Sequence, residues 1–97
     1  MTIDAIGTVE IKSFVHAVEA LDTMLKTSNV TYLNSEKVLG GKLVTLIVGG
    51  RVSDVNQAIE AVKNNSRISS SLKAAILITN PHKEILKFII SKQGSDV

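Results

Sequence analysis

The sequence predicts an α+β ferredoxin-like sandwich with the order β-α-β-β-α-β plus a short C-terminal helix. The four-stranded antiparallel sheet of this fold carries helices on one face. Four segments are rich in β-branched residues, and apolar residues at helical spacing follow the first and third of them. Two strand–helix–strand units of this size close into one sheet. The 97 residues suit a single domain, with a core over about 4–90 and a flexible tail over 91–97.

The first unit opens with a predicted strand, Ala5–Ile11, which mixes apolar, polar and β-branched residues. Ser13 can cap the helix that follows. The apolar face of this helix consists of Phe14, Val18, Leu21 and Leu25. Lys26 suits the C-terminus of the helix, and Asn29 suits a left-handed exit from it.

Two strands are expected in the middle of the chain. Val30–Leu33 is β-rich, and the polar Asn34–Lys37 after it is hairpin-like or edge-like. Leu43–Val48 is the most hydrophobic strand and is expected to be central. Glycine pairs, Gly40–Gly41 and Gly49–Gly50, mark both of its ends.

The second unit repeats the pattern. Ser53 can cap a helix whose apolar face is Val52, Val55, Ile59 and Val62. Asn64–Ser66 ends this helix, and Ser69–Ser71 is a short polar loop before the last strand, Leu72–Ile78. The pair Asn80-Pro81 then predicts the start of a helix, with Asn80 as the N-cap and Pro81 at the first helical position. The short helix that follows has the apolar residues Ile85, Leu86 and Ile89.

Composition excludes several classes of function. The chain has no cysteine, so disulfides, thiolate metal sites and thiol nucleophiles are excluded. A net charge of +2 is too small for a nucleic-acid partner, and no apolar run approaches the ~20 residues of a membrane span. The N-terminus lacks a signal-like pattern, so we expect a soluble cytosolic protein. The mean hydropathy of +0.24 is high for so short a chain and favours burial against other copies.

No set of residues predicts catalysis, a metal site or a cofactor. His16 and His82 are the only histidines, and each suits a surface or interface position better than proton transfer. An acylphosphatase-type enzyme of this fold would need an arginine near Ala5–Ile11, where none occurs. RNA binding would need aromatic residues on the sheet, and the strands offer no such platform. The glycine-rich Val38–Lys42 is either a flexible hairpin or a loop where several backbones approach closely.

An ordered set of segments resembles the bacterial microcompartment shell proteins over about residues 4–90. The resemblance is carried by Asp4–Glu10 with Lys12, Ala17–Lys26, Ser28–Val30, Leu43–Val48 with Gly50, and Asn80–His82. It implies a non-enzymatic domain that forms a flat cyclic homohexamer. Such hexamers tile edge to edge, together with paralogous shell proteins, into the facets of a shell around enzymes in the bacterial cytoplasm.

The resemblance also implies roles for individual residues. It assigns Leu39, Gly40, Gly41 and Lys42 to a central pore for small polar metabolites. It assigns Lys26, Asn29, Asn80, Pro81 and His82 to the contact between hexamer edges. The alternative is a small oligomeric ligand-binding or regulatory module of the same fold that forms no shell.

The chain departs from the family pattern at three places. Its loop reads Leu39-Gly40-Gly41-Lys42 rather than Gly-Ser-Gly and is one residue longer. Leu39 stands where variant loops carry a cysteine for an iron–sulfur cluster, so a thiolate-held cluster is excluded. Asn80 replaces a common arginine, and Gly49 and Arg51 replace a common arginine and aspartate.

Overall fold

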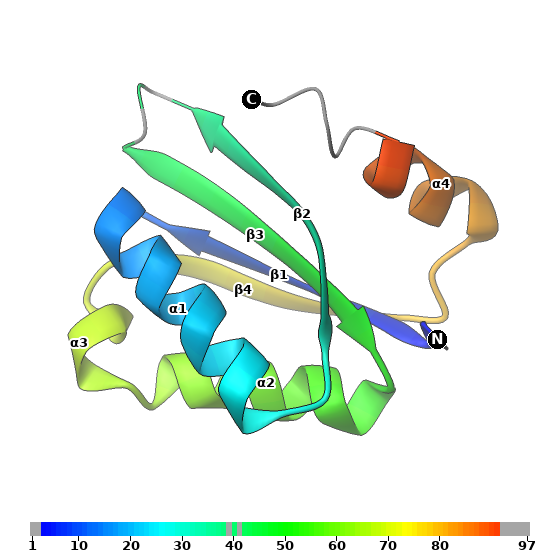
Figure 1. Ribbon diagram of the computed structural model, residues 1–97, viewed down its shortest axis with the longest axis horizontal. Coiled ribbons are helices and arrows are strands. Elements are labelled where there is room, and N and C mark those ends of the chain that lie inside the picture. The colour runs from blue at the N-terminus through cyan, green and yellow to red at the C-terminus, as the bar shows by residue number, and fades with distance from the viewer. Residues whose placement is uncertain (1–2, 39, 41, 92–97) are drawn as a thin grey trace.

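The computed structural model describes residues 3–38, 40 and 42–91, and it confirms the predicted fold class (Figure 1). Residues 92–97, most of the predicted tail, lie outside the described residues. The elements in chain order are β1 (Ala5–Ile11), α1 (Phe14–Thr27), β2 (Thr31–Val38), β3 (Leu43–Gly50), α2 (Val52–Lys63), α3 (Ser66–Ser69), β4 (Leu72–Thr79) and α4 (Lys83–Ser91).

The four strands form one antiparallel sheet in the order β2-β3-β1-β4. In its middle, Val9 of β1 pairs with Leu46 of β3 on one side and with Ala75 of β4 on the other. The most hydrophobic strand, β3, is therefore internal, as predicted, because both of its edges are paired. The outer edges of the sheet belong to β2 and β4.

Helices α1 and α2 cover one face of the sheet, and the core lies between these layers (Figure 1). A Cβ on Gly7 would lie 2.7 Å from Cγ1 of Val55, so the glycine lets α2 pack closely on β1. The buried residues of the two helices are small or aliphatic: Ala17, Ala20 and Met24 in α1, and Val55, Ala58, Ile59 and Val62 in α2. An aliphatic core therefore suffices without tryptophan.

Helix α4 lies on the opposite face of the sheet (Figure 1). Asn34 of β2 is 6% exposed, and its Nδ2 donates a hydrogen bond of 2.7 Å to the carbonyl of Ile89. The ladder between β2 and β3 is irregular between Tyr32 and Asn34, next to this contact. The two main helices, α1 and α2, therefore share one face as predicted, and the C-terminal helix lies on the other.

Helix ends were predicted less well than helix bodies. Ser13 caps α1 as expected, since its Oγ accepts from the N–H of His16. Ser53 does not cap α2: Arg51 holds the N-cap position and makes no side-chain cap bond. A short helix, α3, lies between the predicted helix stop and the predicted loop, and Asn65 caps it by accepting from the N–H of Arg67. Asparagine favours such local bonds, which explains the extra turn of helix.

Candidate functional site

The glycine-rich loop joins β2 to β3 at one end of the sheet. The pair Val38 and Leu43 closes the ladder before the loop. Gly40 has φ +65°, a left-handed conformation that favours glycine, and no atom of the described residues beyond its chain neighbours lies within 4 Å of a Cβ built there. Gly40 and Lys42 are exposed, whereas Leu39 and Gly41 lie outside the described residues. Gly40 and Lys42, the described residues of the loop, therefore project away from the body of the domain.

The residues assigned to the hexamer edge all lie at the other end of the sheet. Lys26 and Asn29 precede the start of β2, where Thr31 pairs with Gly49 at the end of β3. Asn80, Pro81 and His82 follow the end of β4, where Thr79 and Ala5 are partners. Because Ala5 also pairs with Gly50, both groups lie at one end, which we call the outer end. The structure thus separates loop and edge residues by the length of the sheet.

At the outer end, Lys26 is part of an ion pair. Its Nζ lies 3.1 Å from Oδ2 of Asp22, one turn earlier in α1, and the two side chains are 75% and 60% exposed. The last carbonyls of α1 have other donors. Ser28 donates to Met24, and Nε2 of Gln57 donates to the carbonyl of Thr27 over 3.0 Å. Lys26 is therefore oriented by a carboxylate and presented to solvent.

The corner between β4 and α4 differs from its prediction. Asn80 does not cap the helix: it has φ +50°, and its N–H donates to the carbonyl of Asp4 over 2.9 Å. The helix begins at Lys83, so Pro81 is not its first residue. The cap is His82, whose Nδ1 accepts from the N–H of Glu84 over 3.1 Å and whose carbonyl accepts from Ile85. Asparagine tolerates the left-handed conformation, and the helix starts two residues later than expected.

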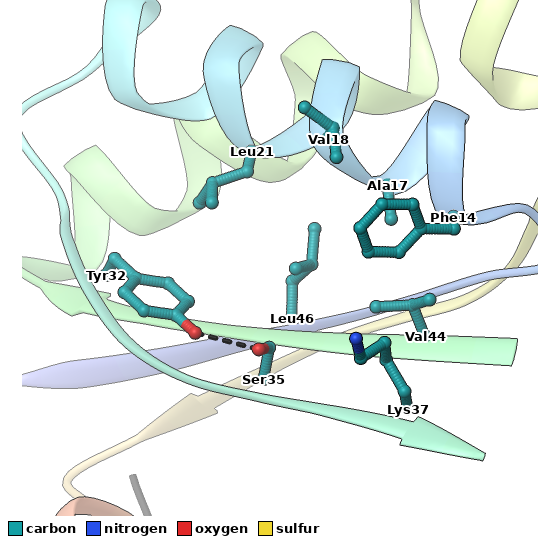
Figure 2. A pocket seen from close by; sticks show the side chains of 9 residues that line it. All are labelled: Phe14, Ala17, Val18, Leu21, Tyr32, Ser35, Lys37, Val44 and Leu46. Atoms are coloured by element: carbon teal, nitrogen blue, oxygen red, sulfur yellow. Dashed lines mark hydrogen bonds between the residues drawn. The ribbon is translucent and has the colours of Figure 1, made fainter. Parts of the chain in front are cut away.

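A groove of about 170 Å³ opens on one flank of the domain, between α1 and the strands β2 and β3 (Figure 2). Its apolar wall includes Phe14 and Val18, which are 50% and 54% exposed. Its rim is polar: Nζ of Lys37 lies 5.1 Å from the centre of the Phe14 ring, a cation–π distance. The lining residues are Phe14, Ala17, Val18, Leu21, Tyr32, Ser35, Lys37, Val44 and Leu46.

The opposite flank, at the β4 edge, also exposes apolar side chains. Ile76 and Ile78 are 51% and 41% exposed, and because they are two residues apart on this edge strand, both project from the sheet face away from α1 and α2. Val52, at the start of α2, is 41% exposed. Both flanks thus leave apolar surface uncovered in the isolated chain, as the mean hydropathy suggested.

The described residues contain no group of three metal-ligating side chains, so no metal centre is evident in them. Nδ1 of His16 contacts Oγ of Ser71, which ties the start of α1 to the start of β4. His82 serves as a helix cap. Both histidines therefore make structural contacts. Among the helices described, none combines the length and apolarity that crossing a bilayer requires.

Sequence reasoning missed three contributors to these surfaces. Asp22 was passed over, although its i,i+4 spacing to Lys26 is a recognisable ion-pair signal. Phe14 was assigned to a helix face without the groove that it lines. The sequence predicts a hairpin-like or edge-like position for Asn34, and nothing local predicts its bond to Ile89, 55 residues away.

Known proteins are similar to this chain over most of its length. The family model of the BMC domain matches residues 5–81. The bacterial microcompartment shell protein PduA of Citrobacter freundii is 38% identical over 86 residues, which are 89% of this chain and 91% of that protein. The carboxysome shell protein CsoS1A of Hydrogenovibrio crunogenus is 37% identical over 90 residues, which are 92% of this chain and 93% of that protein.

The solved structure of a microcompartments protein from Desulfitobacterium hafniense DCB has a TM-score of 0.80 to this chain and 29% sequence identity. The similarity covers 93% of this chain but 48% of the other. This chain therefore spans about half the length of that protein.

Proposed function

Because this chain belongs to the BMC domain family of bacterial microcompartment shell proteins, we propose that six copies form a flat ring whose central pore is lined by the β2–β3 loop. The role of the chain is structural: it is a component of a microcompartment shell, and its family associates with itself and with other shell proteins. The ring, the pore and the tiling edges are the proposal. The chain would contribute one shell domain over residues 1–97, with its core over about 4–90.

The separation of the loop from the outer end is the observation that carries the proposal. In a cyclic ring, each copy needs an inner end that meets the axis, an outer end that meets other rings, and two flanks that meet its neighbours. The β2–β3 loop and the group around Lys26 lie at opposite ends of the strands. The strands would therefore run from the axis to the rim.

The two apolar flanks support the contact between neighbouring copies. A ring is built from heterologous contacts, in which one flank of each copy packs against the other flank of the next. The groove flank with Phe14 and Val18 would receive the β4 edge of the next copy, beside which Ile76 and Ile78 lie on the sheet face. Burial of these half-exposed side chains would stabilise the ring at roughly 25 cal/mol per Å² of apolar surface removed from water.

The loop composition supports a pore for small polar metabolites. Glycine at Gly40 and Gly41 permits close approach of six backbones, whose N–H and C=O groups would line the opening. Leu39 would narrow the opening, and Lys42 near its mouth would favour anions. Neither a metal nor a cofactor has a role in this proposal, and the chain itself would catalyse no reaction.

The ring would act as a facet tile in the bacterial cytoplasm. Its edges, with Lys26, Asn29, Asn80, Pro81 and His82, would contact other copies and paralogous shell proteins. Encapsulated enzymes would lie inside, and their substrates and products would cross the pore. Neither nucleic acid nor a membrane is a partner.

Native mass spectrometry and negative-stain electron microscopy of the purified chain test the proposal. We expect six-copy rings at micromolar concentration and hexagonally tiled sheets or tubes at higher concentration. A monodisperse monomer at high concentration would contradict it, because both apolar flanks would then remain in water.

A further inference from the structure

We propose that Asp22 is a positioning residue for the tiling edge: its carboxylate neutralises Lys26 and holds its ammonium group in place, so that two copies of the outer end can meet. This inference rests on the edge role proposed above for Lys26. The contact that carries it is the 3.1 Å approach of Lys26 Nζ to Asp22 Oδ2 at the end of α1.

The pair has little to contribute to folding. Both side chains are more than half exposed, and solvent screening leaves such surface ion pairs with little effect on stability. The position of the pair, rather than its effect on stability, sets it apart from the other ion pairs. Of the three ion pairs among the described residues, it is the one within the last two turns of α1, beside the outer end. A contact between copies would bring the pair out of bulk water, where its electrostatic effect grows.

The symmetry of an edge contact creates the need for a counter-charge. Where two identical edges meet across a two-fold axis, a residue close to that axis, as proposed for Lys26, lies near its own copy. Two ammonium groups from Lys26 would then face each other and repel. With Asp22 beside each Lys26, each edge presents a neutral pair.

The ion pair also leaves the ammonium group able to bind a neighbour. A lysine ammonium has three N–H donors and no acceptor. Asp22 engages it from within the same helix, so further donors remain for carbonyls of the adjacent copy. The carbonyl of Thr27, a nearby alternative partner on the same helix, already accepts from Gln57.

The test measures the protein concentration at which sheets form, by sedimentation and electron microscopy, as a function of NaCl concentration. For Asp22→Asn at about 20 mM salt, we expect this threshold to rise at least about fivefold over the parent. At about 0.5 M salt the difference should fall to within about twofold, because the Debye length shrinks to ~4 Å. Asp22→Glu keeps the charge at the same spacing and should restore the parent threshold.

Glu60→Gln is the matched control. It removes the carboxylate of another exposed pair within one helix, Lys63 with Glu60 at 3.5 Å, near the end of α2 that leads to the loop side of the sheet. We expect its threshold and salt dependence to equal those of the parent. Native mass spectrometry should show intact rings for all these variants.

Three results would overturn the inference. If Asp22→Asn forms sheets at the parent threshold at every salt concentration, Asp22 has no positioning role. The proposed function would still stand in that case, because the parent protein forms sheets. Loss of the fold in Asp22→Asn would assign the pair to folding instead, and loss of the ring with an intact fold would assign it to the contact between neighbouring copies. If the parent protein forms rings but never sheets, the edge role proposed for Lys26 is wrong, and the role of Asp22 is wrong with it.

Discussion

The side-chain amide of Asn34 donates a hydrogen bond of 2.7 Å to the main-chain carbonyl of Ile89 and thereby ties α4 to the edge strand β2. Oδ1 of the same side chain accepts from the N–H of Ser35 over 2.7 Å. Asn34 is buried, so loss of its side chain would leave the carbonyl of Ile89 and the N–H of Ser35 without this partner in a place that water does not readily reach. This one residue therefore connects the C-terminal helix to the sheet.

Replacement of Asn34 by leucine should loosen α4 and destabilise the chain by about 1–3 kcal/mol, because it leaves polar main-chain groups without their partner. Urea denaturation measures the loss, and hydrogen exchange should show faster exchange of the α4 amides. Asn56→Ala, at an exposed position on α2, is the control and should change neither. Unchanged exchange in α4 would show that the Asn34 bond does not hold the helix.

Replacement of His82 by alanine should fray the first turn of α4, since Nδ1 of His82 accepts from the N–H of Glu84. Loss of a helix cap costs about 0.5–2 kcal/mol. Hydrogen exchange at the amides of Glu84 and Ile85 is the measurement. His82→Asn offers another side-chain acceptor and should retain most of the protection, whereas equal fraying in both variants would argue against capping.

Alanine substitutions at two glycines should destabilise the chain for different reasons. Gly7→Ala should cost about 1–3 kcal/mol, because its Cβ would clash with Val55 at 2.7 Å and force α2 away from β1. Gly40→Ala should cost about 1 kcal/mol through its positive φ, since none of the described residues beyond its chain neighbours lies within 4 Å of the new Cβ. Unfolding midpoints give both values, and a larger loss at Gly40 than at Gly7 would contradict this order.

Val18→Glu should break the proposed ring without unfolding the chain. Val18 is 54% exposed in the isolated domain, so a charge there is tolerated in the monomer but not in a buried contact between flanks. Native mass spectrometry should show monomers, with an unchanged far-ultraviolet circular dichroism spectrum. Val15→Glu, at a 65% exposed position that does not line the groove, should keep the ring.

Lys26→Ala should weaken sheet formation and leave the ring intact, because the residue lies at the outer end and its Asp22 contact is exposed. Electron microscopy at matched concentrations compares the two proteins. A variant that tiles as readily as the parent would show that another residue carries the edge contact.

The order of the elements could be predicted from the sequence because it depends on local patterns. Phe14, Val18, Leu21 and Leu25 repeat at helical spacing, and Leu43–Val48 is apolar on both sides of the strand, so each segment carries its own signal. The assignment of pore and edge residues to two groups also came from the sequence, through the resemblance to shell proteins. The structure places the described members of the two groups at opposite ends of one sheet.

Start and end points of the helices were less predictable. Asn80 and Pro81 are a strong local signal for a helix start, yet α4 begins at Lys83. The N–H of Asn80 bonds to the carbonyl of Asp4, a residue 76 positions earlier, and that contact holds Asn80 in its left-handed conformation. A tertiary hydrogen bond thus outweighs a local preference of similar size.

By itself the sequence determined the fold class, the aliphatic core and the absence of any thiol chemistry, because periodicity and composition are properties of neighbouring residues. Only the tertiary structure decided that Phe14 and Lys37 flank a groove, that Asn34 holds α4 on the second face, and that the loop and Lys26 lie at opposite ends. These relationships join residues far apart in the chain. Their geometry depends on strand register and helix packing, which no local pattern encodes.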